Sequence, residues 1–410
     1  MCKRFTWLLA VMVLVSIGFL VACGSHFSSN SSSNGLVIVP NQGSQVIQAF
    51  GITLSNGRVS QINTSPAVLG QPTAIILDPA GTYAYVTIVP NSAVANSVKA
   101  ASVASYKINS DGTLSAAGTP LAMSAPAGVV SPAAITVDSS GKFLFVADEA
   151  TTSGTIAVAG TVSAFSIGSG GSVTEVAGSP FAVPATAGGA SANPVSVAVT
   201  PRSFPSANAV CSKQTPPTNE YLYAADAATN QVWEFQVNTS SGTLGPPAPS
   251  TSIVGFAAGS VPSGVAVDPC NRFVYVANQV SNNVSAYTIS PTDGSLISVG
   301  PATSAGNGPG PIAVDPLGNF LYVVDKLSNQ ISAYRISSAM GTLTPLSPAT
   351  VTTGTTPVSI AIRSDDNWLF VANYNSASLS QYAITPATGA LNPTATGIAT
   401  DNLPLGVAVK

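Results

Sequence analysis

Carboxylate and amide side chains recur along the chain, each at the end of a short apolar run. The seven equivalent positions, six of which are Asn or Asp, are Asn41, Ile88, Asp148, Asp226, Asn278, Asp325 and Asn373. Oxygen atoms of this kind suit a hard divalent cation such as Ca²⁺ and also hydrogen-bond to sugar hydroxyls. Glu149 follows Asp148 and makes this point the most acidic of the set. Asp148, Glu149, Asp226 and Asp325 are therefore the candidate ligand, metal or catalytic residues.

The same pattern has a second interpretation, because Asn and Asp also start hairpin turns by bonding to their own backbone. Hydrolysis could use a carboxylate base or a bound metal at these positions. The only histidine, however, is His26, which precedes the repeats. The sequence contains no nucleophile elbow, no metal-ligand histidine spacing and no phosphate loop. These observations favour a binding module over an enzyme.

Proline marks the start of a repeated unit. The seven prolines lie 47 to 68 residues apart: Pro72, Pro132, Pro194, Pro262, Pro309, Pro357 and Pro404. Repeats of this length are typical of propeller blades or solenoid coils. An apolar run follows each proline, and then a turn such as Asp315–Gly318 and a second strand with aromatic residues two apart, such as Tyr83 and Tyr85. A third strand and a hairpin glycine precede a short fourth strand, so each unit predicts four antiparallel strands, which is a propeller blade.

The two ends of the repeat region complete each other. Residues 36–41 align with 273–278, so the region opens with a second strand, and residues 404–410 form a first strand with nothing after it. The prediction is an all-β, seven-bladed β-propeller over residues 36–410. Its ring is closed by the C-terminal strand (404–410) pairing with the N-terminal strands (36–62), which leaves no open edge.

The motif Phe273–Asn278, followed by Asn283–Ile289 and Asp293–Leu296, resembles the Tyr-Val-Thr-Asn repeat of surface-layer propellers. It also resembles the 6-phosphogluconolactonase-type lactonase family. That resemblance implies His, Arg and Glu around the central channel, but no blade contains a histidine, and the loops between second and third strands offer only Lys99 and Lys326 as cations. We therefore expect a binding or scaffold module for a glycan or a protein partner. The alternative is a lactone hydrolase that uses carboxylates or a bound metal at the channel mouth.

The N-terminus has the features of an export signal. Lys3 and Arg4 precede an apolar run that ends at Ala22, so residues 1–22 are expected to be a signal peptide. The sequence Leu20–Cys23 resembles the lipobox of bacterial lipoproteins, which implies that Cys23 carries a lipid and that residues 23–35 are a flexible tether. An ordinary cleaved signal or an uncleaved anchor is the alternative. The expected location is the bacterial cell envelope, on the periplasmic or cell-surface side. Position 24 is Gly and not Asp, a feature that resembles lipoproteins sorted to an outer membrane.

Two cysteines remain in the blades. Cys270 lies in the turn between the first and second strands of its blade, and Cys211 lies in an enlarged version of the same turn one blade earlier. In an oxidising compartment these residues are expected to form a disulfide. Two buried free thiols are the alternative.

Charge and loop length bear on the partners. The formal charge is −3 and no basic stripe is present, so nucleic-acid binding is disfavoured. Three long segments, 87–102, 148–161 and 180–193, suggest a recognition surface on one side of the ring, although they could equally be elaborations of packing.

Overall fold

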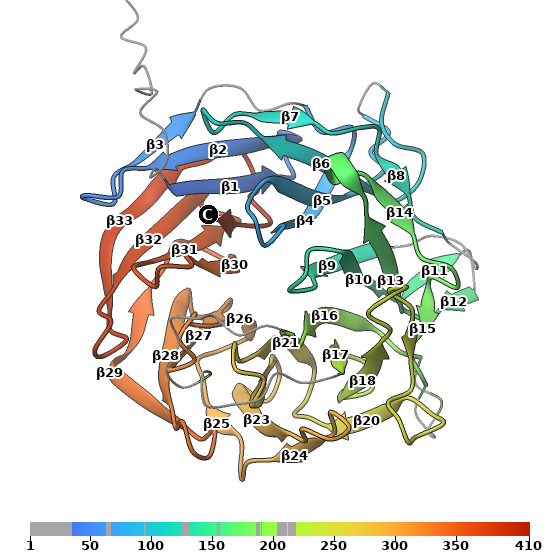
Figure 1. The fold of residues 1–410 in the computed structure, drawn as a ribbon. Coiled ribbons are helices and arrows are strands. Elements are labelled where there is room, and N and C mark those ends of the chain that lie inside the picture. The colour runs from blue at the N-terminus through green and yellow to red at the C-terminus, as the bar shows by residue number, and fades with distance from the viewer. Residues whose placement is uncertain are drawn as a thin grey trace, which may run out of the picture. The chain divides into compact units, whose positions relative to one another are not determined.

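The computed structural model describes residues 35–62, 67–93, 96–124, 131–153, 156–185, 189, 191–202, 211 and 219–410. These residues form seven antiparallel sheets arranged in a ring, which confirms the predicted all-β, seven-bladed propeller (Figure 1). The expected signal peptide, Cys23 and the tether up to residue 34 lie outside the described residues. No helix of the described part of the chain is long and apolar enough to cross a membrane.

The blades are numbered along the chain, and the strands of each run from the central channel outward. Blade 1 holds β4 (Gln71–Leu77), β5 (Tyr83–Val89), β6 (Ser102–Ile108), β7 (Leu114–Ala116) and β8 (Leu121–Ala122). Blade 2 holds β9 (Ser131–Val137), β10 (Phe143–Glu149), β13 (Thr161–Ile167), β14 (Val173–Glu175) and β15 (Phe181–Ala182), with a 3₁₀ turn η1 (Ser169–Gly171) and a separate hairpin of β11 (Thr151–Ser153) and β12 (Ile156–Val158). Blade 3 holds β16 (Pro194–Val199), β17 (Glu220–Asp226), β18 (Gln231–Val237), β19 (Leu244–Gly245) and β20 (Val254–Ala257).

The remaining blades follow the same order. Blade 4 holds β21 (Pro262–Val267), β22 (Phe273–Asn278), β23 (Asn283–Ile289), β24 (Leu296–Ser298) and β25 (Thr303–Ser304). Blade 5 holds β26 (Pro309–Val314), β27 (Phe320–Asp325), β28 (Gln330–Ile336) and β29 (Leu343–Thr352). Blade 6 holds β30 (Pro357–Ile362), β31 (Trp368–Asn373), β32 (Ser378–Ile384) and β33 (Leu391–Ala399). Blade 7 joins β34 (Ala408–Val409) to β1 (Gly35–Asn41), β2 (Val46–Ile52) and β3 (Val59–Ile62).

The fourth strand is more varied than the sequence suggested. It is one long strand in blades 5 and 6, whereas in blades 1 to 4 two short pieces each pair with the third strand. The segment 148–161, expected as a loop, contains the β11–β12 hairpin.

Ring closure follows the predicted pairing. Val37 pairs with Val409 and Ile38 with Ala408. The backbone of Leu36 and Lys410 exchanges two hydrogen bonds, N–H of Leu36 to O of Lys410 at 3.1 Å and N–H of Lys410 to O of Leu36 at 2.8 Å. The two ends of the described chain are therefore held in one sheet.

The second strand of each blade packs on both neighbouring blades, because successive side chains point to opposite faces of the sheet. In β22, Phe273 and Tyr275 pack with Leu321 of blade 5. Val274 of the same strand packs on blade 3. The aromatic pair two residues apart thus builds the contact between consecutive blades.

A hydrogen bond fixes this contact. The hydroxyl of Tyr275 donates to the carbonyl of Gly341 in the next blade at 3.1 Å. Gly341 has φ +72°, and a Cβ there would lie 2.5 Å from the Phe273 ring. A side chain at this turn position would therefore collide with the preceding blade, which explains the recurring hairpin glycine.

Candidate functional site

The seven loops that join second to third strands are called the mouth loops, and the Asn, Asp or Ile that ends each second strand occupies a ring position. The opposite side of the ring, called the turn side, carries the turns between first and second strands. The sequence analysis placed its candidate ligands at the ring positions.

The amides at the ring positions are buried within their own blades. Asn278 is fully buried, its Oδ1 accepts a hydrogen bond from Gly259 N at 3.0 Å, and its Nδ2 donates to Ser285 Oγ at 3.0 Å. Asn373 repeats this arrangement with Gly354 N at 3.1 Å and Ser380 Oγ at 3.0 Å. Each amide ties the connection that enters its blade to the third strand, so its polar atoms hold the fold together.

Asp226 serves a similar purpose with a carboxylate. Its Oδ1 accepts hydrogen bonds from Asn193 N at 3.0 Å and Ala228 N at 3.0 Å, and its Oδ2 accepts one from Trp233 Nε1 at 3.1 Å. The side chain is fully buried. Asp226 therefore stabilises its hairpin and the incoming connection, which matches the turn interpretation of the pattern.

Asp148 and Asp325 are less completely bonded. Asp148 Oδ2 accepts hydrogen bonds from Ser163 Oγ at 2.6 Å and Thr161 Oγ1 at 3.1 Å, and Asp325 Oδ2 accepts one from Ser332 Oγ at 2.7 Å. The Oδ1 atom of each is buried with no hydrogen-bond partner among the described residues. Burial raises the pKa of Asp148 to about 7 and that of Asp325 to about 6. Glu149 is partly exposed, and burial raises its pKa as well.

The four candidate carboxylates do not converge. Asp148 and Glu149 belong to blade 2, Asp226 to blade 3 and Asp325 to blade 5. The described residues contain no group of three or more His, Cys, Asp or Glu side chains that could hold a metal ion. The described residues therefore bring no three such side chains together around one point.

Three asparagines in the mouth loops were missed by the sequence analysis. Asn230, Asn282 and Asn329 have positive φ, and each Oδ1 accepts an N–H just before the next blade, from Val261 at 2.7 Å, Gly308 at 2.8 Å and Thr356 at 2.7 Å. Each stands four residues after a ring position and directly before its third strand. That spacing is the signal from which they could have been found.

The residue that follows each ring position is more accessible. Gln42, Gln279, Lys326 and Tyr374, called the mouth residues, are partly exposed. Their backbone N–H groups bond beside the start of the innermost strand, as Lys326 N does to Gly308 O at 3.0 Å. The hydroxyl of Tyr374 donates to Oε1 of Gln42 at 3.1 Å, so mouth residues of neighbouring blades reach one another. Lys99, the other cation expected here, is exposed in blade 1.

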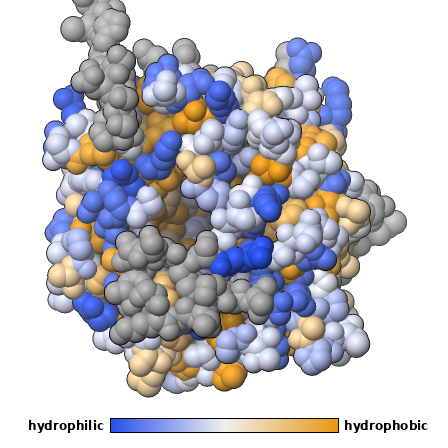
Figure 2. Space-filling model, viewed as in Figure 1, coloured by the Kyte–Doolittle hydropathy of each residue, from blue (hydrophilic) through white to orange (hydrophobic). Residues whose placement is uncertain are grey.

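The central channel has a different character. It encloses about 600 Å³ lined by the innermost strands, mainly by aliphatic residues such as Ile75, Ile135, Ile312 and Ile360. Figure 2 shows the face seen in Figure 1 hollowed at its centre. The channel walls offer branched apolar side chains, while the polar mouth residues lie at the loops.

Of the three long segments that the sequence analysis noted, 148–161 is hydrogen-bonded to the connection that enters blade 3, and 87–102, among its described residues, is not. In blade 2, Ala150 N donates to Asn193 Oδ1 at 2.7 Å and Gly160 N donates to Ala192 O at 2.8 Å, so the segment after β10 is bonded to the connection that enters blade 3. The loop of blade 1 instead bonds to the connection before its own first strand, through Val98 N and Leu69 O at 2.8 Å.

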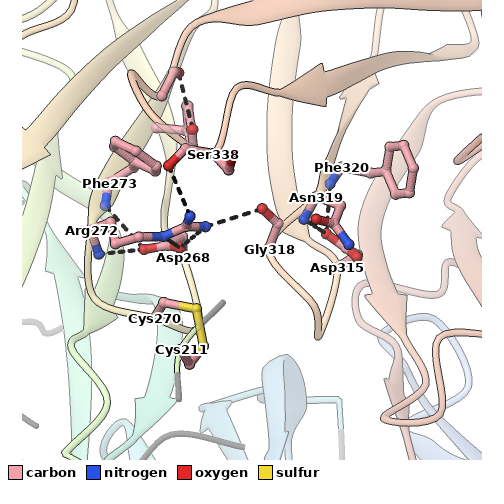
Figure 3. A network of polar contacts seen from close by, with 12 residues as sticks. Cys211, Asp268, Cys270, Arg272, Phe273, Asp315, Gly318, Asn319, Phe320 and Ser338 are labelled. Carbon is pink, nitrogen blue, oxygen red and sulfur yellow. Dashed lines mark hydrogen bonds and ion pairs between the residues drawn. A yellow bond between two sulfur atoms is a disulfide. The ribbon is translucent and has the colours of Figure 1, made fainter. Parts of the chain in front are cut away.

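On the turn side, Cys211 and Cys270 are joined by a disulfide (Figure 3). Arg272 lies close by and is almost buried, with its Nη2 2.7 Å from Asp268 Oδ2. It also donates to the carbonyls of Gly318 and Ser338 in blade 5, both at 3.2 Å. This arginine is fully engaged in joining two blades.

Seven four-stranded blades closed by the two chain ends define a seven-bladed β-propeller. The sequence profile of the family described as "Lactonase, 7-bladed beta-propeller" matches residues 33–405. The chain therefore belongs to the lactonase family of seven-bladed β-propellers.

Solved structures show the same fold at low sequence identity. A proposed 6-phosphogluconolactonase from Bacteroides fragilis has 19% identity and a TM-score of 0.71, with 93% of this chain and 99% of that chain covered. A periplasmic gluconolactonase from Pseudomonas aeruginosa has 19% identity and a TM-score of 0.70, with 92% and 99% covered. A comparison with curated protein sequences found no match.

Proposed function

We propose that this chain is a ligand-binding propeller of the lactonase family that holds a glycan at its mouth loops. The observation that carries the proposal is that adjacent residues of the mouth loops differ in burial and bonding. Asn278, Asn373 and Asp226 are buried and bonded within the blades, whereas the mouth residues are partly exposed at the same loops: Gln42, Gln279, Lys326 and Tyr374. Amide and phenol groups both donate and accept hydrogen bonds, and the ammonium group of Lys326 donates them, which suits a polyhydroxylated ligand.

The test is binding of neutral oligosaccharides and bacterial cell-wall fragments on a glycan array, followed by calorimetry with the best binder. Tyr374→Ala and Lys326→Ala should each weaken binding by about two- to tenfold, the effect of one lost hydrogen bond. Met340→Ala is the matched control, because Met340 is an exposed residue in a turn between third and fourth strands, away from the mouth loops. Binding that is unchanged in both mouth variants, or no glycan binding at all, would overturn the proposal.

A lactone hydrolase is the second candidate, and one observation favours it. Asp148 has an unpartnered Oδ1 and a pKa raised to about 7 by burial, which suits a base that takes a proton from water as the water attacks a lactone carbonyl. The test is hydrolysis of δ-gluconolactone and 6-phosphogluconolactone, with and without chelator. Turnover lost in Asp148→Asn and kept in Asp226→Asn would establish this candidate over the binding module.

We further propose that the propeller is held in the cell envelope by a lipid on Cys23. The signal-like residues 1–22 support export, and the Cys211–Cys270 disulfide supports an oxidising compartment. Mass spectrometry of the protein from membranes should find diacylglycerol on Cys23, and Cys23→Ala should release the protein from the membrane fraction. Retention of that variant would contradict the anchor.

A further inference from the structure

On the turn side, blades 4 and 5 have equivalent buried aspartates, Asp268 and Asp315, but the group that faces the carboxylate differs between them. In blade 4, Asp268 is fully buried beside the guanidinium of Arg272, which also reaches Gly318 of blade 5 (Figure 3). The negative charge of Asp268 is thus matched by a cation that bridges blades 4 and 5. The contact surface between two consecutive blades is called a seam.

Blade 5 repeats this turn without the cation. Oδ1 of Asp315 accepts the N–H groups of Asn319 and Phe320, both at 2.6 Å, just as Asp268 accepts those of Arg272 and Phe273. Asn319 stands where blade 4 has Arg272. No hydroxyl, amide or cationic side chain of the described residues hydrogen-bonds to Asp315 Oδ2, and this residue is fully buried.

Asp366, from the turn of blade 6, holds the position that Gly318 has in blade 5, where a Cβ would lie 3.3 Å from Oδ2 of Asp268. The equivalent neighbour of Asp366 is Asp315, and the two carboxyl groups interact. Asp366 has φ +58°, at the turn position where Gly81, Gly141 and Gly318 stand in blades 1, 2 and 5. It is 5% exposed, and neither of its oxygens has a donor among the described residues. An aspartate in a backbone conformation that favours glycine is therefore directed at a second buried aspartate.

The other ionisable groups nearby offer no compensation. Asp365, in the same turn, adds negative charge and is paired with Arg363. Arg272 is held by Asp268. The hydroxyl of Tyr322, which faces both carboxyl groups, donates to Gly389 O at 2.8 Å. Two buried carboxylates without a cation repel each other, whereas one bound proton converts the repulsion into an O–H···O hydrogen bond.

We propose that Asp315 and Asp366 share one proton that fastens blade 5 to blade 6, and that losing this proton loosens the seam at the end of the central channel. Asp315 itself lines the channel cavity, so the device acts at the channel wall. The contact between blades 4 and 5 has the guanidinium of Arg272 at the corresponding place.

The sign of the pH dependence follows from the direction of the shift. Burial, followed by the charge of Asp315, raises the pKa of Asp366 from 3.8 to about 7, and burial raises that of Asp315. Between pH 3.8 and about pH 7, the unfolded and folded pKa values of Asp366, the folded state holds a proton that the unfolded state has released. Stability therefore falls as pH rises from about 4 to about 7 and is level above that range.

The experiment compares urea unfolding of the wild-type protein and Asp366→Asn from pH 4.5 to 8.5. The asparagine amide donates to Asp315 with no proton to lose, and Asn271 shows that asparagine accepts this backbone conformation. The ratio of the wild-type to the variant unfolding constant should rise about tenfold per pH unit up to about pH 7, and then stay constant. Asp366→Gly introduces the residue that blades 1, 2 and 5 have at this turn position, and it should give the same profile. It replaces the asparagine variant in the experiment if that variant does not fold.

Asp365→Asn is the matched control, because it removes one negative charge from the same turn at a more exposed position. Its unfolding constant should rise with pH by the same factor per unit as in the wild type but become level at a lower pH, because the charge of Asp365 also raises the pKa of Asp366. As a local readout, hydrogen exchange at the amides of Asn319 and Phe320, corrected for the intrinsic rate, should lose protection above pH 7 in the wild type alone. Parallel profiles for the wild type, Asp366→Asn and Asp366→Gly would overturn the proposal.

Discussion

Gln381 Nε2 donates a 2.7 Å hydrogen bond to the carbonyl oxygen of Gly57, which lies 324 positions earlier in the chain. In blades 3, 4 and 5 the equivalent carbonyl of the next blade is bonded by a tyrosine hydroxyl, from Tyr223, Tyr275 and Tyr322. Blade 6 has Phe370 in place of that tyrosine. The donor has moved to the neighbouring strand, and the contact between blades is kept.

Gln381→Ala should lower the free energy of unfolding by about 1–3 kcal/mol, because the buried carbonyl of Gly57 loses its donor. Phe370→Tyr in the same background should recover part of this loss by supplying the hydroxyl found in blades 3 to 5. Urea denaturation of the two variants, with Phe370→Tyr alone as control, measures the effect. A double variant no more stable than Gln381→Ala would show that the two donors are not interchangeable.

Removal of Pro404–Lys410 should abolish the cooperative unfolding transition, because β1 would lose its inner partner and expose an unpaired edge. Arg363→Ala is the milder variant, since Arg363 Nε donates to the backbone oxygen of Lys410 at 3.2 Å. It should cost about 1 kcal/mol. Calorimetry distinguishes the two effects, and an unchanged transition after truncation would refute closure through this strand.

Replacing both disulfide cysteines, as in Cys211→Ala with Cys270→Ala, should destabilise the protein by about 4 kcal/mol, the chain-entropy value for a bridge spanning 59 residues. The m-value of the oxidised protein should be smaller than that of the variant, because the bridge restricts the unfolded chain. Adding reductant to the wild type should reproduce the loss, and adding it to the double variant should change nothing. A wild-type protein insensitive to reductant under denaturing conditions would contradict the prediction.

Glu234 gives a separate pH dependence in blade 3. It is fully buried with no hydrogen-bond partner on either oxygen among the described residues, and burial raises its pKa from 4.5 to about 8. The folded state thus holds a proton that the unfolded state lacks between these values, and stability falls as pH rises through that window. Glu234→Gln, which places here the residue that blade 6 has at Gln381, should be more stable than the wild type at pH 8. Thermal melts at pH 5 and pH 8 measure it, and equal differences at the two values would contradict the assignment.

The blades were predictable because their signals are local. Alternation of side chains, aromatic residues two apart such as Phe273 and Tyr275, and the turn from Asp315 to Gly318 each depend on a few neighbouring residues. The hydrogen bond from Tyr275 to Gly341 was not predictable, because it joins residues 66 positions apart through a hydroxyl whose direction depends on blade packing.

The candidate site could not be predicted, because the sequence does not show which groups the polar side chains contact. Asn278 carries the atoms of a ligand site, but Gly259, in the connection before its blade, uses them. Sequence cannot distinguish an amide that faces a channel from one that faces a neighbouring loop, since both occur at the end of a strand. Asp366 illustrates the converse, because nothing in its turn reveals that its carboxyl group lies against that of Asp315 in another blade.

The two ends of strand β1 lie on opposite sides of the propeller. Gly35 lies beside Arg363 and Lys410 on the turn side, whereas Asn41, at the other end of the same strand, starts a mouth loop. The first described strand therefore begins on the side opposite the mouth residues. The same side carries the Cys211–Cys270 disulfide and the Asp315–Asp366 pair, so the mouth residues and the buried carboxyl pair occupy opposite ends of the ring.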